Sequence, residues 1–484
     1  MTDIIRVEKL NEVYNRISCE PSVGYEIKDY FTFKVPNYQF MPAYRNKMWD
    51  GNLYLYNPLT CLLYGGLNHH LEEFAKLRDY KIEYSSDFSY NNFTIDDANK
   101  FFRSLNLTME PRDYQIDAFV NCVKHKRKLL LSPTGSGKSF IIYLLARYYN
   151  KKTLIIVPTT SLVHQLSSDF ISYGYDDTDN IHKIFEGQSK TTNSKFVFST
   201  WQSIYKQPKT WFKQFDVVIG DEAHLFKAKS LTSIMTGLES CKYRFGFTGT
   251  LDDSNTHKLV LEGLFGPIRK VTSTSELIDK KVLSDFMINS IILSYPDETR
   301  KLVSKMKYQE ELDFLVTLPD RNKFICNLCK SLKGNTLLLF QFVEKHGKVL
   351  HSMLKNSKID KPIYFVSGQI ESTEREKIRK LVEAGNECII VASYGTFSTG
   401  INIPNLHNII FSSPSKSKIR NLQSIGRGLR KAKNKKQSVL YDISDDLTWK
   451  SKKNFTILHY IERIKIYNEE KFNYKIYKIN INIK

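Results

Sequence analysis

The chain has 484 residues, of which 41% are hydrophobic, so it can bury a core in each of about three domains and is not disordered as a whole. Its 71 basic and 51 acidic side chains give a net charge of +20, which favours a polyanionic partner. No apolar run approaches the roughly 20 residues of a membrane-spanning helix, and the seven cysteines are scattered as in a reducing compartment. We therefore expect a soluble intracellular protein.

Residues 1–88 predict a small α+β domain. YFTFKVP alternates like a strand, NKMWDGNLYLYN combines a turn with alternation, and HHLEEFAKLRDY has the pattern of an amphipathic helix. The domain carries 10 basic and 12 acidic residues, which argues against a general DNA clamp. A basic and aromatic tip around Tyr44, Lys47 and the predicted DNA contacts Arg45 and Trp49 suits a DNA fork; a surface hairpin packed on the next domain is the alternative.

Residues 89–108 are expected to form a linker, and two series of short apolar strands alternating with helical segments follow it. The first series, in residues 109–275, is KLLLS, TLIIVP, KFVFST, DVVIGDE and RFGFTG. The second, in residues 276–450, is NTLLLFQF, PIYFVSG, CIIVASY, NIIFSS and SVLYDI. This alternation predicts two tandem α/β domains with parallel sheets. A basic extension at 451–484 looks helical and then strand-like.

The segment SPTGSGKS, from Ser132 to Ser139, predicts a phosphate-binding loop between a strand and a helix. Its glycines let backbone N–H groups face phosphate oxygens, Lys138 can reach the β- and γ-phosphates, and Ser139 can ligate Mg²⁺. Ser132 stands where the strict motif has glycine. The residues expected to bind ATP in this loop are Thr134, Gly135, Ser136, Gly137, Lys138 and Ser139.

The segment VVIGDEAH ends an apolar strand in Asp221 and Glu222. An aspartate at a strand end can hold the Mg²⁺ that bridges the phosphates, so Asp221 and Ser139 are the expected metal ligands. Glu222 can orient and deprotonate the attacking water.

The octapeptide QSIGRGLR begins at Gln423 and contains Arg427 and Arg430, which share a face if the segment is helical. Two guanidinium groups so placed could neutralise charge that develops on the γ-phosphate. We expect these three residues to be catalytic, with ATP in a cleft between the two α/β domains; a solvated basic helix face is the alternative.

In this order, the three motifs resemble motifs I, II and VI of superfamily 2 helicases of the DEAH-type group, and the resemblance spans about residues 109–445. It implies two RecA-like motor domains. It also implies adenine recognition by Arg112 and Gln115 in PRDYQ, and coupling of hydrolysis to movement by His224, Thr248 and Thr250.

The resemblance further implies contacts with one DNA strand from hydroxyl-bearing residues in VPTTSLVHQ, STWQS and SYGTFSTGINIP. These residues are Thr159, Thr160, Ser199, Thr200, Ser393, Ser398 and Thr399. Asn402 stands where the family often has aspartate, which leaves one contact between the ATP and nucleic-acid sites in doubt.

Over its whole length, including FTFKVPNYQFMPAYRNKMWDGNLYLY, the chain is similar to the UvsW family of recombination and repair helicases of T4-like phages. The resemblance implies an ATP- and Mg²⁺-dependent DNA helicase that unwinds R-loops and D-loops, migrates Holliday junctions and regresses stalled forks. It would serve recombination, repair and replication control. An RNA helicase, the motor subunit of a restriction nuclease, and a non-catalytic nucleic-acid-binding module are the alternatives.

The expected partners are DNA, branched DNA and R-loops above all, and single-strand-binding or recombination proteins, with no membrane. We expect a monomer in the cytoplasm, that of the host cell if the protein is viral. Cys326 and Cys329 are spaced C-x-x-C, but no second pair follows, so we expect two positions on one helix rather than a zinc site.

Overall fold

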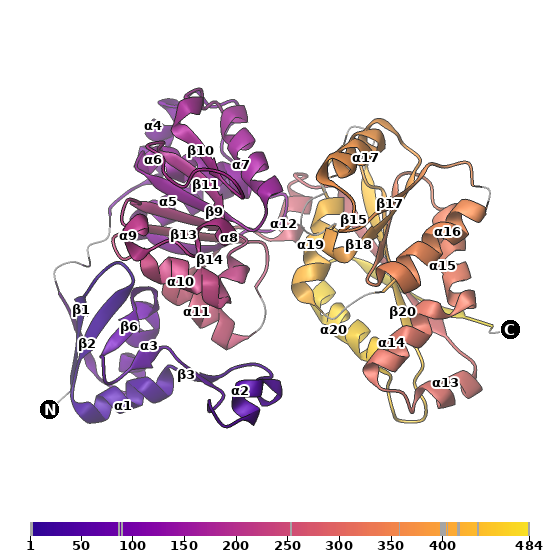
Figure 1. Cartoon of the computed structure of the whole chain (residues 1–484), viewed down its shortest axis with the longest axis horizontal. Coiled ribbons are helices and arrows are strands. Elements are labelled where there is room, and N and C mark those ends of the chain that lie inside the picture. Colours follow the sequence, from indigo (N-terminus) through magenta and orange to yellow (C-terminus); the bar gives the residue numbers. More distant parts are fainter. Residues whose placement is uncertain are drawn as a thin grey trace. The chain divides into compact units, whose positions relative to one another are not determined.

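The computed structural model describes residues 3–85, 88, 91–251, 254–357, 359–396, 403, 405–413, 417–432 and 435–482. The chain divides into two compact units, residues 1–132 with 137–271 and residues 133–136 with 272–484 (Figure 1). Unit 1 holds an N-terminal domain and a first α/β domain, and unit 2 holds a second α/β domain. Within the described ranges, none of the helices has the length and apolar character needed to cross a bilayer.

The N-terminal domain is built on a five-stranded mixed sheet of order β5-β6-β2-β1-β7, with a separate antiparallel pair β3–β4. The predicted helix and the two alternating segments are confirmed as α3, β3 and β4. Its elements are β1 Ile4–Lys9, β2 Tyr14–Ser18, α1 Pro21–Tyr30, β3 Thr32–Lys34, η1 Tyr38–Phe40, α2 Pro42–Arg45, β4 Asn52–Tyr54, β5 Tyr56–Asn57, β6 Leu62–Tyr64, η2 Gly65–Leu67, α3 Asn68–Leu77 and β7 Lys81–Tyr84.

The first α/β domain has a seven-stranded parallel sheet of order β10-β11-β9-β12-β13-β8-β14. The apolar core of the N-terminal domain continues into one face of this sheet, so the two domains share a hydrophobic cluster. After α4 Ile95–Arg103, the elements are α5 Asp113–His125, β8 Arg127–Leu131, α6 Lys138–Tyr149, β9 Thr153–Val157, α7 Thr160–Ser172, η3 Thr178–Asn180, β10 Ile181–Ile184, β11 Phe196–Thr200, α8 Trp201–Ile204, α9 Lys209–Phe212, β12 Val217–Asp221, η4 Ala223–Lys227, α10 Lys229–Gly237, β13 Tyr243–Thr248, α11 Asn255–Phe265 and β14 Ile268–Lys270.

The second α/β domain has a seven-stranded parallel sheet of order β17-β18-β16-β19-β20-β15-β21. Its elements are α12 Thr274–Asp279, β15 Asp285–Ser294, α13 Asp297–Val303, α14 Tyr308–Thr317, α15 Pro319–Ser331, β16 Thr336–Phe340, the π-helix η5 Val343–Gly347, α16 Lys348–Asn356, β17 Ile363–Val366, α17 Ser372–Ala384, β18 Ile389–Ser393, β19 Asn408–Phe411, α19 Lys418–Gly428, β20 Gln437–Asp446, α20 Phe455–Glu469 and β21 Tyr474–Asn480.

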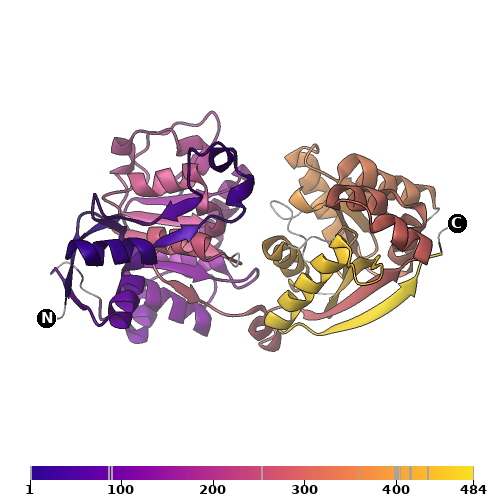
Figure 2. The same cartoon turned by 90° about the horizontal axis from the view of Figure 1, so that it is seen from below.

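The segment that the sequence suggests as a separate extension forms α20 and β21, and β21 runs in parallel beside β15 at the edge of the second sheet (Figure 2). Numbered in chain order within its own domain, each α/β sheet then has the same strand order, 3-4-2-5-6-1-7. The predicted fold class, two RecA-like parallel-sheet domains behind a small α+β domain, is confirmed.

Cys326 and Cys329 lie on α15, as expected, and both are buried in the core of the second domain. Burial raises the pKa of the Cys326 thiol to about 11 and that of Cys329 further. A thiol held protonated in this way is a poor metal ligand.

Candidate active site

The phosphate-binding loop connects β8 to α6, as the sequence predicts. Gly135 and Gly137 adopt φ of 86° and 81°, a left-handed backbone that favours glycine. Ser136 Oγ donates to the carbonyl of Pro133 at 2.7 Å, which tightens the turn around Thr134. The two left-handed glycines therefore let the loop curl at the N-terminus of α6, where a phosphate is favoured.

Gln115, the predicted adenine-reading residue, packs directly on this loop. A Cβ added to Gly137 would lie 2.4 Å from Gln115 Nε2, so position 137 has no room for a side chain. The backbone N–H of Arg112 donates to Gln115 Oε1 at 2.9 Å, which holds the buried amide in place at the start of α5. Arg112 itself is exposed.

Residues from the phosphate-binding loop, from VVIGDEAH and from the segment TGT at residues 248–250 meet in one chain of contacts. Lys138 Nζ lies 3.6 Å from Glu222 Oε1, and Glu222 Oε2 lies 3.3 Å from His224 Nδ1. The same His224 nitrogen is 3.0 Å from Thr248 Oγ1, which donates to the carbonyl of Thr250 at 2.8 Å. A change at the phosphate loop can therefore reach the TGT segment through side chains alone.

A second, backbone link joins the same elements. The N–H of Ser132 donates to the carbonyl of Thr248 at 2.8 Å, so the strand that ends in the phosphate loop is bonded to the strand that ends in TGT. Ser132 is buried and does not adopt a positive φ, so this position does not require the glycine of the strict motif.

Two acidic side chains stand at the end of β12. Burial raises the pKa of Asp221 to about 6, against the lowering effect of the Lys138 ammonium. Glu222 adopts φ of 50°, an unusual conformation for a side chain of this kind and one that recurs at functional sites. A buried carboxylate beside a lysine is a group whose charge a bound cation would stabilise.

Tyr173 is a residue that sequence reasoning missed. Its hydroxyl lies 2.6 Å from Ser139 Oγ, the expected Mg²⁺ ligand at the start of α6. Tyr173 follows α7, and a lone tyrosine after an amphipathic helix carries no signal of this contact.

Helix α19 of the second domain contains the first six residues of the octapeptide QSIGRGLR. A Cβ added to Gly428 would lie 2.3 Å from Ile409 Cδ1, so glycine lets this helix approach β19 closely. The carbonyl of Gly428 accepts from Lys435 Nζ at 2.7 Å and from Ser438 Oγ at 2.6 Å, which ends the helix firmly. Gln423 lies within α19 and Arg430 lies two residues beyond it, while the side chain of Arg427 lies outside the described residues.

The hydroxyl-bearing residues implied as DNA contacts differ in exposure. Thr160 is exposed and Thr159 half-buried, and both lie at the start of α7, where Thr159 Oγ1 accepts from the N–H of Leu162. Thr200 caps α8 and bonds to Ser203 at 2.9 Å. Ser393 bonds to Thr396 at 2.8 Å.

Ser199 is fully buried, and its hydroxyl donates to the carbonyls of Ile184 and Thr200. The hydroxyl is thus satisfied inside the domain, and a DNA contact from the backbone amide of Ser199 stays a prediction. Ser398, Thr399 and Asn402 lie outside the described residues.

The predicted tip of the N-terminal domain lies between β3 and β4, around η1 and α2 (Figure 1). Its base is held together by the rings of Tyr38 and Tyr44, whose centroids are 4.7 Å apart. Gly51, with φ of 81°, leaves room for the Tyr38 ring. Lys34 Nζ lies 4.8 Å from the centre of that ring.

The most exposed apolar side chains of the tip are not the predicted ones. Trp49 is half-buried and donates from Nε1 to the carbonyl of Asn52 at 2.8 Å, whereas Phe40 is 63% and Met48 74% exposed. Arg45 is exposed, and its guanidinium lies 6.0 Å from the centre of the Phe40 ring. Sequence reasoning overlooked Phe40 and Met48 because single apolar residues usually lie in the core.

Three family models match the chain in order. Residues 4–85 match the N-terminal domain of the DNA helicase UvsW, residues 108–253 the Res subunit of type III restriction enzymes, and residues 320–432 the helicase conserved C-terminal domain. The latter two matches fall on the two α/β domains.

Individual proteins match over longer stretches. The ATP-dependent DNA helicase UvsW of Enterobacteria phage T4 is 39% identical over an alignment of 494 positions, gaps included. This alignment covers 96% of this chain and 97% of that protein. The DNA 3'-5' translocase XPB2 of Sulfurisphaera tokodaii is 27% identical and covers 69% of this chain and 81% of its own length. The crystal structure of T4 UvsW superposes with a TM-score of 0.53 at 36% identity and covers 99% of this chain and 100% of that one.

Proposed function

The chain belongs to the UvsW family of superfamily 2 helicases and is an ATP-dependent DNA helicase, and on this premise we propose that its substrate is branched DNA. The proposed activities are unwinding of R-loops and D-loops, branch migration of Holliday junctions and fork regression. The match over nearly the whole chain supports a DNA helicase rather than an RNA helicase, a restriction motor or a non-catalytic module.

We assign the ATP chemistry to the first α/β domain. The backbone N–H groups from Gly135 to Ser139 would hold the triphosphate, and Lys138 would leave Glu222 to neutralise its β- and γ-oxygens. Glu222, released from Lys138, would then accept a proton from the attacking water.

The donors present also fit Mg²⁺, which prefers oxygen ligands and binds through few carboxylates. Ser139 Oγ and the half-buried Asp221 carboxylate would hold the ion, which would neutralise phosphate charge when bound. Ser139 could donate its hydroxyl hydrogen to Tyr173 while an oxygen lone pair binds the ion.

The exposed tip of the N-terminal domain is the feature that supports a branched substrate. The large apolar side chains of Phe40 and Met48 are exposed to solvent, and the Arg45 guanidinium lies near the Phe40 ring. They belong to the short segment between β3 and β4 that the contact of the Tyr38 and Tyr44 rings stabilises. Apolar side chains of this kind can insert between base steps, and aromatic ones can stack on unpaired bases. A motor that only tracks one strand has no use for such a wedge, whereas a fork offers it unpaired bases.

The test compares two activities of full-length variants in the same preparation. Phe40→Ser with Met48→Ser should leave the ATPase stimulated by single-stranded DNA unchanged and slow branch migration of a four-way junction about 5- to 150-fold, from about 1–3 kcal/mol per lost stacking contact. Leu59→Ser is the matched control, because Leu59 is 89% exposed in the same domain but lies outside the tip. Equal branch migration by the double variant and the parent would refute the wedge.

A further inference from the structure

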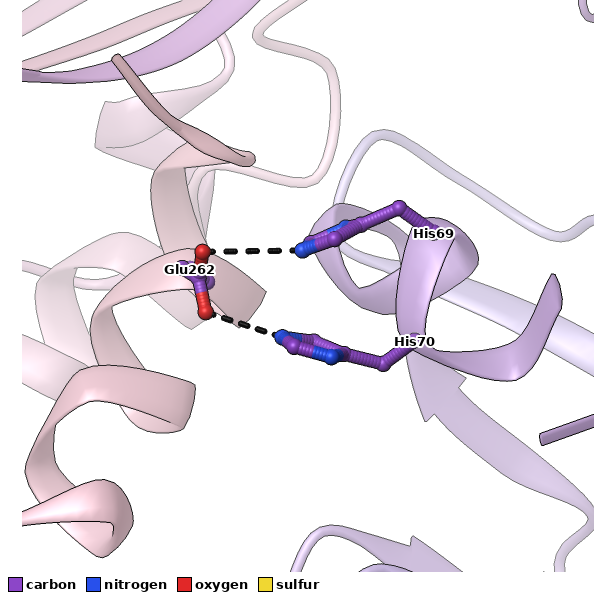
Figure 3. Close-up of side chains that lie close together, drawn as sticks. All are labelled: His69, His70 and Glu262. Carbon is purple, nitrogen blue, oxygen red and sulfur yellow. Dashed lines mark hydrogen bonds and ion pairs between the residues drawn. The ribbon is translucent and has the colours of Figure 1, made fainter. Parts of the chain in front are cut away.

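His69 and His70 are consecutive residues of α3, and both imidazoles face the carboxylate of Glu262 in α11 (Figure 3). His70 Nε2 lies 2.9 Å from Glu262 Oε2, and His69 Nε2 lies 3.5 Å from Glu262 Oε1. The two rings are 4.0 Å apart at their centres. Among the residues that the structure describes, this is the only group of three His, Cys, Asp or Glu whose ligand atoms all lie within 4.8 Å of one another.

We propose that His69, His70 and Glu262 form a zinc site that fastens the N-terminal domain to the first α/β domain. Imidazole nitrogen and carboxylate oxygen are preferred ligands of Zn²⁺, with bonds of about 2.0–2.2 Å, so tetrahedral geometry requires about 3.3 Å between neighbouring ligand atoms. The two observed separations of 2.9 and 3.5 Å lie on either side of this value, but they involve different carboxylate oxygens. The Glu262 carboxylate would therefore turn to present one oxygen to the ion. Zinc would thus replace the protons now shared between the imidazoles and the carboxylate, with small adjustments of the side chains.

The surrounding groups orient the ligands. Glu73 Oε2 lies 3.2 Å from His70 Nδ1, which leaves Nε2 as the ligand atom and completes the carboxylate–histidine arrangement typical of zinc sites. The N–H of Ile268 donates to Glu262 Oε1 at 3.2 Å, and the Glu262 side chain is 4% exposed. Glu262 is therefore held in place before any ion binds.

The site lies on a tight domain boundary and borders a cavity. A Cβ added to Gly66 would lie 1.9 Å from the carbonyl oxygen of Glu262, so the two backbones are in contact beside the cluster. His69 also lines a cavity of about 500 Å³ between the N-terminal and first α/β domains, and a water from this cavity would serve as the fourth ligand. The zinc proposal stands on this geometry and does not depend on which DNA is the substrate.

The experiment uses the full-length protein after treatment with a chelator. Equilibrium dialysis against Zn²⁺ with elemental analysis should give one tight site per chain, and Zn²⁺ should raise the melting temperature. His69→Gln with His70→Gln should weaken that binding more than about 100-fold, since both nitrogen ligands are lost, and Glu73→Gln about 10- to 100-fold. Glutamine keeps an N–H that can donate to Glu262, so the domain boundary retains a polar contact.

His125→Gln is the matched control, because His125 lines the same cavity but is not part of the cluster. The zinc affinity of this variant should equal that of the parent. Co²⁺ serves as a spectroscopic probe: bound at this site it should show tetrahedral visible bands without a thiolate charge-transfer band. The proposal is overturned by the absence of a tight site, by equal affinity in the double-histidine variant, or by a thiolate band that assigns the ion to cysteine.

Discussion

The two parallel sheets share one strand order, yet the loops that follow their first strands have opposite chemistry. β8 leads into two glycines with positive φ and then Lys138, which opens α6. β15 leads through Pro296 into the exposed Asp297 and Glu298, which open α13. A helix N-terminus attracts phosphate, but two carboxylates in the same place repel it. The shared strand order therefore does not determine nucleotide binding. The loop after the first strand determines which of the two α/β domains can bind a nucleotide.

The two α/β domains also differ in how they accommodate buried arginines. In the first domain, the buried Arg244 donates to the backbone carbonyls of Leu264, Leu238 and Met235. In the second domain, Arg321 and Arg463 each form a buried pair with an aspartate of β20. Both arrangements supply oxygen acceptors to a buried guanidinium, which would otherwise carry a large desolvation cost.

The largest effect is expected from Lys138→Ala, which removes the main side-chain cation of the phosphate loop. ATP hydrolysis should fall to background. DNA binding should persist, because the other basic side chains of the chain are unchanged. Lys151→Ala, which removes an exposed lysine beyond the other end of α6, should hydrolyse ATP normally. Normal turnover by Lys138→Ala would show that the first sheet is not the ATP-binding copy.

Arg427→Ala tests whether the second sheet contributes to hydrolysis despite its acidic loop. If Arg427 acts on the charge of the transition state, kcat should fall about 10³-fold or more while ATP affinity changes little. Arg379→Ala, an arginine paired with Glu383 within α17, is the control. A loss of affinity alone would make Arg427 a ground-state ligand.

Glu222→Gln should keep ATP binding and lower turnover about 10²- to 10⁴-fold, because the amide cannot accept a proton from water. Nucleotide binding can be followed by fluorescence and turnover by phosphate release. Glu239→Gln, which alters a surface glutamate paired with Lys209, should behave like the parent. Parent-like turnover of Glu222→Gln would exclude Glu222 as the base.

A smaller effect is expected from the exposed lysines that follow α19, which could contact DNA phosphates. Lys431 and Lys436 are exposed, but Lys435 is buried, burial lowers its pKa to about 7, and its Nζ donates to Gly428. Lys431→Ala with Lys436→Ala should reduce the salt dependence of DNA binding by up to about two units of slope. Lys435→Met should leave that slope unchanged. An equal reduction of the slope in Lys435→Met and in the double variant would contradict the distinction between buried and exposed lysines.

The smallest effect is expected from Asp297→Ala with Glu298→Ala. These carboxylates are exposed, and Asp297 pairs with Arg300 within its own helix. ATP affinity and turnover should match the parent if the second sheet binds no nucleotide. Stoichiometry above one ATP per chain in the variant would show that only these charges keep the second sheet empty.

Most of the fold could be predicted because ten of the strands are short apolar runs, and such runs bounded by turns are the pattern of buried parallel strands. β15 was missed because Asp285, Asn289 and Ser290 interrupt its apolar residues. β21 was recognised as strand-like, but its partner could not be: Tyr474 pairs with Ile288, far earlier in the chain, and parallel register leaves no local signal.

The candidate site divides in the same way. Phosphate chemistry points to Lys138 and Glu222, and the resemblance to superfamily 2 helicases adds His224 and Thr248. The structure brings the four into one chain of contacts. The cluster of His69, His70 and Glu262 could not be predicted, because it depends on how the N-terminal domain docks against α11.

The place of β21 has a consequence for how the second domain is made. β15 pairs with β20 on one side and with β21 on the other, and both partners are synthesised long after it. Until they emerge from the ribosome, the ten residues of β15 present two unpaired backbone edges. Nascent chains interrupted between β15 and β20 should therefore be the species most prone to aggregate and to recruit chaperones.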